Sequence, residues 1–100
     1  MLRVSPQALA ALDDIWIYLA RESGSVDVAD RQVQAVAARF PLLEQWPLVG
    51  RARDDLRAGL RSYPVGRYLI IYRMEGADVL ILHIIHASRD LDAVLRCSDP

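Results

Sequence analysis

The sequence predicts an α+β domain in which an N-terminal α-helical hairpin packs on a small antiparallel β-sheet. Two observations predict it. Apolar residues recur every three or four positions through most of the first half, as on one face of a helix. Further along, β-branched and aromatic residues dominate two runs separated by turn formers. The chain has 100 residues, 53% of them hydrophobic, so we expect one globular domain over residues 1–96 and a polar tail at 97–100.

Two capped helices should form the hairpin. Ser5 followed by Pro6 is a helix start, because the hydroxyl caps free N–H groups and proline gives up a donor that the first turn does not use. This helix should end near Ser23 and Gly24, and Ser25 can cap the next one after a short loop, which favours antiparallel packing. The apolar stripes consist of Leu9, Leu12, Ile15, Trp16 and Leu19, and then of Val26, Ala29, Val33, Val36, Phe40 and Leu43.

Pro41 interrupts the second stripe. A proline inside a helix removes a hydrogen bond and clashes with the preceding turn, at about 3 kcal/mol. We therefore expect a kink or break near Phe40, with residues 42–45 forming a separate last turn that Trp46 and Pro47 end.

The sheet is expected from the second half of the chain, with a possible short strand at residues 2–4. A loop at residues 47–55 precedes three strands, and the last two are apolar on both faces, as in the middle of a covered sheet. The expected strands are residues 56–63 (interrupted by Gly59), 68–74 and 79–87, with turns at 64–67 and 75–78 and a short helix at 90–96.

Charge is unevenly distributed along a chain whose formal net charge is −1. Residues 51–73 hold six arginines and two aspartates, a net charge of +4. A basic middle on a nearly neutral chain favours local docking of an acidic partner over coating of nucleic acid. A solvated, arginine-rich loop and strand is the alternative. All twelve basic residues are arginines, whose planar cations suit carboxylates and phosphates.

Several classes of protein are disfavoured. The single Cys97 cannot form an intramolecular disulfide. The N-terminal residues do not resemble a signal peptide, and no apolar run approaches the length that crosses a bilayer. The sequence has no Gly-rich phosphate loop and no metal-binding motif. We therefore expect a cytoplasmic protein without a membrane segment, cofactor or metal.

The residues that can carry chemistry are histidines, tyrosines and arginines of the sheet. His83 and His86 lie three apart on one strand, so one should face the helices and the other the open face. By alternation, His83 is in phase with Ile81, and the apolar surroundings suggest that at least one of the two histidines is a buried, hydrogen-bonded structural residue. Arg73 is costly to bury, so its face should be partly open to a ligand, and Arg61 and Arg67 can join it across the sheet. Salt bridging within the sheet is the alternative reading of these arginines.

Five segments in order resemble the ParE toxins of the ParE/RelE superfamily, over about residues 3 to 95. They are Leu12-Asp13-Asp14-Ile15-Trp16-x-Tyr18, Phe40-x-x-Leu43-x-x-x-Pro47-x-x-Gly50-Arg51-x-Arg53, Gly59-Leu60-Arg61-Ser62, Tyr68-Leu69-Ile70-Ile71-Tyr72-Arg73 and His86-Ala87-Ser88-Arg89-Asp90. Two features depart from the family pattern. Pro41 lies in a stretch that is normally helical, and the tail after Leu95 is short and polar.

The resemblance implies a toxin of a type II toxin–antitoxin pair, with no enzymatic activity of its own, that inhibits DNA gyrase. It also implies a ParD-like antitoxin whose tail wraps the toxin in a hetero-oligomer, with DNA contacted only through the antitoxin. The residues expected to bind antitoxin or target are Trp16, Arg61, Arg67, Tyr72, Arg73, His86 and Arg89.

A RelE-like ribosome-dependent mRNA endonuclease is the alternative function. Cleavage by 2′-hydroxyl attack requires a base, an acid and cations around the phosphate. Those groups would come from His86, Tyr72, Arg61 and Arg73. The net charge of −1 and the absence of lysine disfavour a protein that works inside the ribosome.

Overall fold

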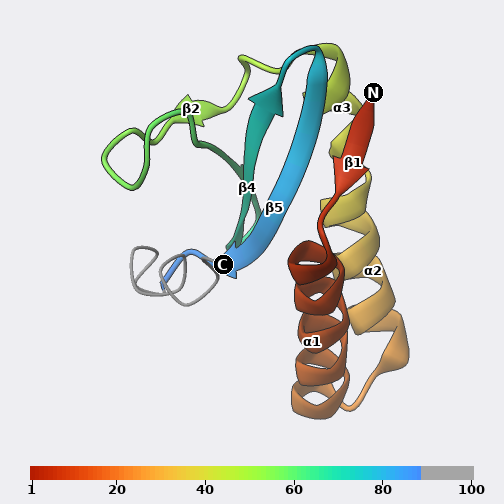
Figure 1. Cartoon of the computed structure of the whole chain (residues 1–100). Helices are drawn as coiled ribbons and strands as arrows, with labels where there is room; N and C mark the ends of the chain where they lie inside the picture. The colour runs from red at the N-terminus through yellow and green to blue at the C-terminus, as the bar shows by residue number, and fades with distance from the viewer. Residues whose placement is uncertain (89–100) are drawn as a thin grey trace.

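The computed structural model describes residues 1–88, in which an α-helical hairpin packs against one face of a five-stranded sheet (Figure 1). The predicted α+β class is confirmed. The elements in chain order are β1 (Leu2–Val4), α1 (Pro6–Ser23), α2 (Val26–Ala37), α3 (Phe40–Gln45), β2 (Arg51–Ala52), β3 (Arg61–Val65), β4 (Tyr68–Glu75) and β5 (Asp78–His86).

Both predicted helix starts are present. The Ser5 hydroxyl oxygen accepts the N–H of Ala8 at 3.1 Å, and Ser25 caps α2 in the same way. The Ser5 hydroxyl also donates to the carbonyl of Leu82 at 2.7 Å. The cap of α1 is therefore tied directly to β5, which fixes where the helix leaves the sheet.

The break expected at Pro41 is also present. Helix α2 ends at Ala37, and α3 begins at Phe40 with Pro41 in its first turn. A proline at that position loses no hydrogen bond, because the first N–H groups of a helix have no partner within it. Pro41 therefore starts a short helix and does not distort a long one.

The sheet has the strand order β1-β5-β4-β3-β2. Neighbouring strands are antiparallel except for β1, which pairs parallel to β5 with Leu2 opposite Val79 and Val4 opposite Ile81. A short strand was predicted at residues 2–4, but its partner strand was not. The parallel pairing adds the first residues of the chain to the edge of the sheet.

On the other side of the sheet, β2 lies within the stretch predicted as a loop, and β3 differs from the prediction in its limits. Strand β2 pairs with the start of β3, which begins only at Arg61 because residues 53–60 form turns closed by a 2.7 Å bond from Arg53 N–H to Leu60 O. Strand β3 continues through Pro64. Proline fits there because β2 pairs only with Arg61 and Ser62, so that β3 is an edge strand beyond them.

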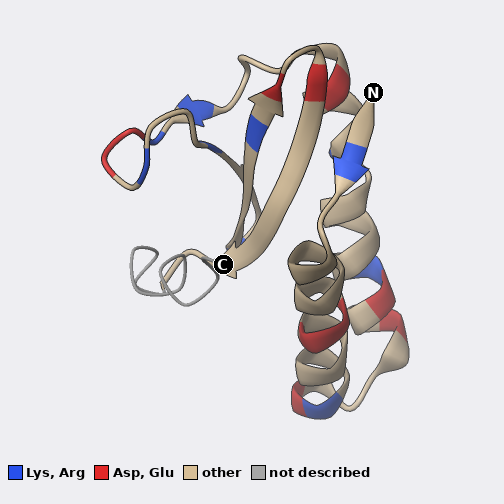
Figure 2. Ribbon diagram, viewed as in Figure 1, with Lys and Arg blue, Asp and Glu red and all other residues tan. Residues whose placement is uncertain are grey.

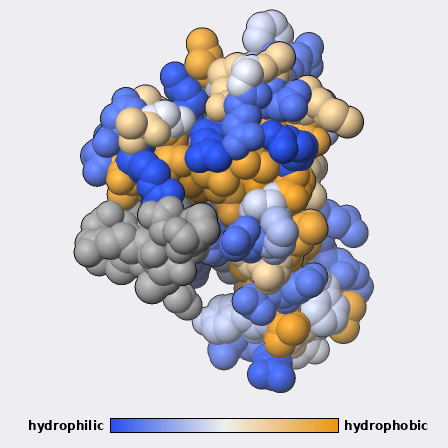
Figure 3. All heavy atoms as spheres, in the orientation of Figure 1, coloured by the Kyte–Doolittle hydropathy of each residue, from blue (hydrophilic) through white to orange (hydrophobic). Residues whose placement is uncertain are grey.

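Both faces of the central strands are apolar, as predicted. The larger cluster joins the helices to the sheet, and the smaller one lies on the opposite, open face, where Figure 3 shows apolar surface. The open-face cluster consists of Leu60, Ile71 and Ile85, with Leu56, Leu69 and Leu82 packed against it. No helix within residues 1–88 has the length and apolarity needed to cross a membrane. The helix predicted at 90–96, Arg89 and Cys97 lie outside the described residues.

Candidate partner-binding cleft

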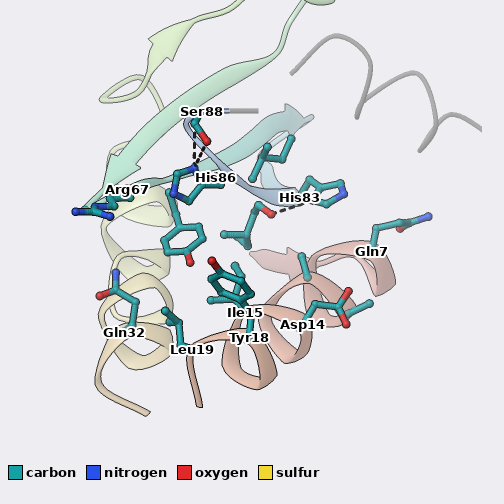
Figure 4. A pocket seen from close by; sticks show the side chains of 16 residues that line it. Gln7, Asp14, Ile15, Tyr18, Leu19, Gln32, Arg67, His83, His86 and Ser88 are labelled. Carbon is teal, nitrogen blue, oxygen red and sulfur yellow. Dashed lines mark hydrogen bonds between the residues drawn. The ribbon is translucent and has the colours of Figure 1, made fainter. Parts of the chain in front are cut away.

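A cleft of about 1140 Å³ opens between α1 and the end of β5 (Figure 4). The cleft exists because β1 pairs with β5 only as far as Ile81. The N–H of Ser5 then bonds to Ile81 O at 2.9 Å, and the chain turns away into α1. Beyond Ile81, β5 has no neighbouring strand on this side in the described part of the chain. An unpaired strand edge beside an apolar cavity is a common form of protein-binding site.

A β-bulge at Leu82 decides which histidine faces the helices. Tyr72 is opposite Ile81 while Ile71 is opposite His83, so Leu82 is an extra residue in β5. Regular alternation from Ile81, which is in the helix-side core, would have turned His83 toward the helices. The bulge reverses this phase. The expectation that the two histidines face opposite sides holds, but it is His86 that faces the helices.

His86 lies at one end of the cleft against Tyr68. The two rings meet edge to face, with centroids 5.3 Å apart. The Nδ1 atom of His86 accepts the backbone N–H of Ser88 at 3.1 Å and lies 2.6 Å from its hydroxyl. Because Nδ1 accepts from a backbone N–H, the proton of the neutral ring is on Nε2. Burial, and secondarily the neighbouring Tyr18, raise the pKa of Tyr68, which therefore stays a neutral hydroxyl.

His83 also borders the cleft, because the cavity wraps around the free edge of β5. Its Nδ1 atom lies 3.1 Å from the carbonyl of Ile84. Both histidine side chains are partly exposed. Neither is the fully buried structural histidine that the apolar surroundings in the sequence suggested.

The α1 wall of the cleft carries a polar stripe. Gln7, Ala11, Asp14 and Tyr18 are four or three residues apart and therefore lie on one face of α1. Tyr18 is 59% exposed, although it is a large aromatic residue. Tyr18 belongs to the first of the family-like segments but was not among the predicted binding residues. The spacing of this stripe, next to the apolar one, was the signal that could have identified it.

Arg67 closes the cleft at the turn between β3 and β4 (Figure 4). It is the one arginine among the described residues that line the cavity, and Asp14 is the one carboxylate. Arg67 is exposed and has no ion-pair partner within residues 1–88. Of the predicted binding residues within residues 1–88, Arg67 and His86 are thus the two that the structure brings to this cavity.

Trp16 has a contact within the hairpin. Its indole Nε1–H donates to the carboxylate of Asp30 on α2 at 2.7 Å, which ties α1 to α2. Trp16 is half-buried and does not line the cleft.

Tyr72 and Arg61 form a structural clamp at the other end of β4. The Tyr72 hydroxyl donates to Pro47 O at 2.7 Å and accepts the N–H of Gly50 at 2.9 Å, while Arg61 Nη1 donates to Gly50 O at 2.6 Å. Burial raises the pKa of Tyr72. Tyr72 is 0% exposed. It was predicted to contact a partner directly, but its side chain has no exposed surface with which to do so. It holds a loop in place.

Arg73 lies on the open face of the sheet, opposite in direction to Tyr72. Its Nη2 atom is 2.5 Å from the carboxylate of Glu75, which also pairs with Arg3 on β1. Hydrogen bonds from Arg73 and then from Arg3 hold the pKa of Glu75 below its usual value. Figure 2 shows acidic and basic segments side by side where β4 and β5 approach β1. The Nε atom of Arg73 is enclosed without a hydrogen-bond partner among the described residues.

The four residues of the nuclease hypothesis do not converge. Tyr68, opposite His86, is four residues from Tyr72 along β4, which at ~3.3 Å per residue is about 13 Å. Arg73 faces the other side of the sheet, and Arg61 is bound to loop carbonyls. Nor does any group of three His, Cys, Asp or Glu side chains within residues 1–88 converge on a metal-sized site.

Comparison with known proteins places the chain in a family of toxins. The profile described as "ParE toxin of type II toxin-antitoxin system, parDE" matches residues 2–91. The chain is 35% identical to Toxin ParE1 of Caulobacter vibrioides over 95 residues, which cover 93% of this chain and 95% of that protein. It is 39% identical to Toxin ParE3 of the same organism over 74 residues, 74% of each chain. The chain belongs to the ParE toxin family of type II toxin–antitoxin systems.

Solved structures have the same fold. A chain of the chromosomal ParDE toxin–antitoxin system from P. aeruginosa superposes with a TM-score of 0.77 at 24% identity, covering 87% of this chain and 95% of that one. A chain of the toxin–antitoxin complex RelBE2 from Mycobacterium tuberculosis gives 0.66 at 24% identity, covering 86% and 95%. At this identity the likeness concerns the fold alone.

Proposed function

We propose that this ParE-family chain arrests growth by binding DNA gyrase and is neutralised by a ParD-like antitoxin in the cleft between α1 and β5. The cleft carries the proposal for the antitoxin, because it combines an unpaired strand edge, an apolar floor and an unpaired cation. A chain with this fold in the P. aeruginosa ParDE system supports the choice of partner. DNA is reached only through the antitoxin in the resulting hetero-oligomer.

The chemistry of the cleft defines the antitoxin segment that it fits. Ala11, Ile15 and Ile84 offer apolar contacts, and Tyr18 and Arg67 offer donors at the rim. An antitoxin segment with apolar anchors and at least one carboxylate matches both the apolar contacts and the donors at the rim. The carboxylate would pair with Arg67, and the hydroxyl of Tyr18 would donate to a backbone carbonyl of the antitoxin.

Arg61 and Arg73 have a smaller part in this proposal than the sequence suggested. Arg61 bonds to the carbonyl of Gly50, and Arg73 pairs with Glu75 on the far face of the sheet. An antitoxin segment in the cleft contacts Arg67 and does not reach either of them. Replacement of Arg61 or Arg73 should therefore affect antitoxin affinity less than replacement of Arg67.

The antitoxin part is tested by measuring affinity for the protein encoded by the neighbouring open reading frame. Arg67→Ala should weaken binding by about tenfold or more, as expected for a charged contact at an interface. Arg31→Ala, an exposed arginine of α2 outside the cleft, is the matched control and should bind like the wild type. Equal affinities of the two variants would exclude the cleft as the antitoxin site.

The gyrase part is tested by inducing the toxin alone and following the DNA-damage response and mRNA integrity together. Growth arrest with an induced damage response and intact mRNA is the expected result. In a purified system, the toxin should inhibit gyrase supercoiling and the antitoxin should restore it. Arrest accompanied by cut, ribosome-bound mRNA would replace gyrase inhibition with the ribonuclease function.

A further inference from the structure

A second exposed surface lies on the opposite end of the sheet from the cleft. In the loop of residues 46–50, Trp46 is 59% exposed, Leu48 is 69% exposed and Val49 is 49% exposed. Together with Pro47 these side chains surround a shallow apolar hollow. Loops at the surface usually carry polar side chains, so three large apolar ones in succession require an explanation.

The loop is held in place by hydrogen bonds to its backbone, and its exposed side chains take no part in them. Its backbone is bonded to Tyr72 and Arg61, as described above, and the N–H of Val49 donates to Trp46 O at 3.0 Å. Gly50 leaves no room for a side chain, because an added Cβ would lie 2.3 Å from the Tyr72 hydroxyl. The fold therefore fixes the loop through its backbone. The apolar side chains of Leu48 and Val49 contribute little to this.

The border of this surface is cationic. Arg51 is exposed directly after the loop and forms no ion pair within residues 1–88, although its charge, after the hydrogen bond from Arg53, helps to lower the pKa of Asp55. On the other side, Glu44 is engaged with the N-terminal ammonium group at 3.8 Å. A partner that matches this surface therefore has an apolar depression bordered by carboxylates. Because the loop is already ordered, little conformational entropy is lost on binding.

We propose that the surface formed by Trp46, Leu48, Val49 and Arg51 is the part of the toxin that docks on its protein target. The inference rests on the proposed function and assigns the antitoxin and the target to two separate surfaces of the toxin. The cleft at the Tyr68 end of β4 takes the antitoxin. The apolar loop at the Tyr72 end enters an apolar, carboxylate-bordered pocket of the target.

The test compares two pairs of substitutions, each pair at exposed apolar residues. Leu48→Gln with Val49→Gln changes the loop, and Leu9→Gln with Val28→Gln changes the outer surface of the hairpin, where those residues are 54% and 40% exposed. Each variant is induced alone, and colony-forming units are counted. Melting temperature and affinity for the neighbouring gene's product are measured on purified protein.

The loop variant should melt and bind antitoxin like the wild type, yet leave at least about tenfold more surviving cells, as expected when central apolar contacts are lost. The hairpin variant should arrest growth like the wild type. A folded loop variant that still arrests growth fully overturns the inference while leaving the proposed function intact. A wild-type chain that causes no arrest overturns the proposed function itself.

Three other occupants of the surface give different results. Loss of antitoxin affinity in the loop variant would assign the loop to the antitoxin interface. A wild-type dimer in sedimentation that the loop variant lacks would assign it to self-association. A photo-crosslinker at position 48 that yields a nuclease-sensitive adduct would assign it to nucleic acid. Each of these results overturns the proposal. A nuclease-resistant adduct with a cellular protein other than the antitoxin, whose overproduction restores growth, supports it.

Discussion

The hydroxyl of Tyr72 bridges the two ends of the apolar loop, donating to Pro47 O at 2.7 Å and accepting the N–H of Gly50 at 2.9 Å. One buried side chain in the middle of the sheet thus satisfies two backbone groups that the loop itself leaves unpaired. Loss of a buried partner leaves a desolvated polar group, which costs more than the bond contributed. The stability of the loop therefore depends on a residue of another element.

Tyr72→Phe should lower the free energy of unfolding by about 1–3 kcal/mol, because two enclosed backbone groups lose their partner. Urea unfolding measures the change. Tyr63→Phe is the control, since Tyr63 is half-buried in the same sheet and no hydrogen bond from its hydroxyl is present within residues 1–88. Equal losses in the two variants would show that the bridge does not contribute specifically.

Gly50→Ala should be strongly destabilising, by about 2 kcal/mol or more, as for other overpacked sites. The added Cβ would lie 2.3 Å from the Tyr72 hydroxyl and 2.9 Å from Ser62 O. Gly24→Ala is a useful comparison, because Gly24 has open space around it and a φ of +67°, so its cost is only conformational. Unfolding curves that rank Gly24→Ala as the more damaging change would contradict the steric argument.

Ser5→Ala should cost more than Ser25→Ala, although both serines cap a helix. A lost N-cap costs about 1 kcal/mol. Ser5 additionally donates to Leu82 O of β5 at 2.7 Å, and that carbonyl would lose its partner. Denaturant midpoints of the two variants provide the comparison. If they agree within error, the link between α1 and β5 adds nothing to the cap.

Glu75→Gln should flatten the dependence of stability on pH under acidic conditions. The pKa of Glu75 in the folded chain is held below its ordinary 4.5 by Arg73 and Arg3. A depressed carboxyl pKa means that the ion pairs stabilise the fold above the unfolded pKa, and that this stabilisation is lost as pH falls through the folded one. The wild type should therefore lose its advantage over Glu75→Gln as the pH falls through 4.5 and below.

Glu22→Gln is the control for this experiment, since Glu22 is exposed on α1 and forms no ion pair in the described part of the chain. When the free energy of unfolding is measured in urea at successive pH values, its dependence on pH should be the same for Glu22→Gln and the wild type. A wild-type advantage over Glu75→Gln that grows as the pH falls would have the wrong sign for this mechanism.

Local features of the fold could be predicted from the sequence, because their causes are local. Ser5, Ser25 and Pro41 each act within one helical turn, and the helix boundaries follow from them. The parallel pairing of Leu2 with Val79 could not be predicted, since it depends on residues far apart in the chain. The bulge at Leu82 could not be predicted for a related reason, because a bulge is defined by the register of a strand against its partner strand.

The candidate site was predictable only in part. Arg67 and His86 were chosen from the sequence and border the cleft. Tyr72 was predicted to be a contact residue but is buried by the loop from Pro47 to Gly50. The sequence of a strand does not show whether a distant loop covers one of its tyrosines. Tyr18 lines the cleft but was not among the predicted binding residues, because it lies on the polar stripe of α1 and not on the apolar stripe from which the helix was predicted.

The parallel pairing of β1 has a consequence for the order in which the toxin is made. The residues of β1 are synthesised before β5, whose partner residues begin at Val79, and must wait for it before they can join the sheet. Such a contact between distant parts of the chain slows folding. The hairpin of α1 and α2 can form early, but the wall of the cleft that β5 supplies is completed last. Translation thus leaves an interval in which the cell already contains most of the chain and no finished toxin.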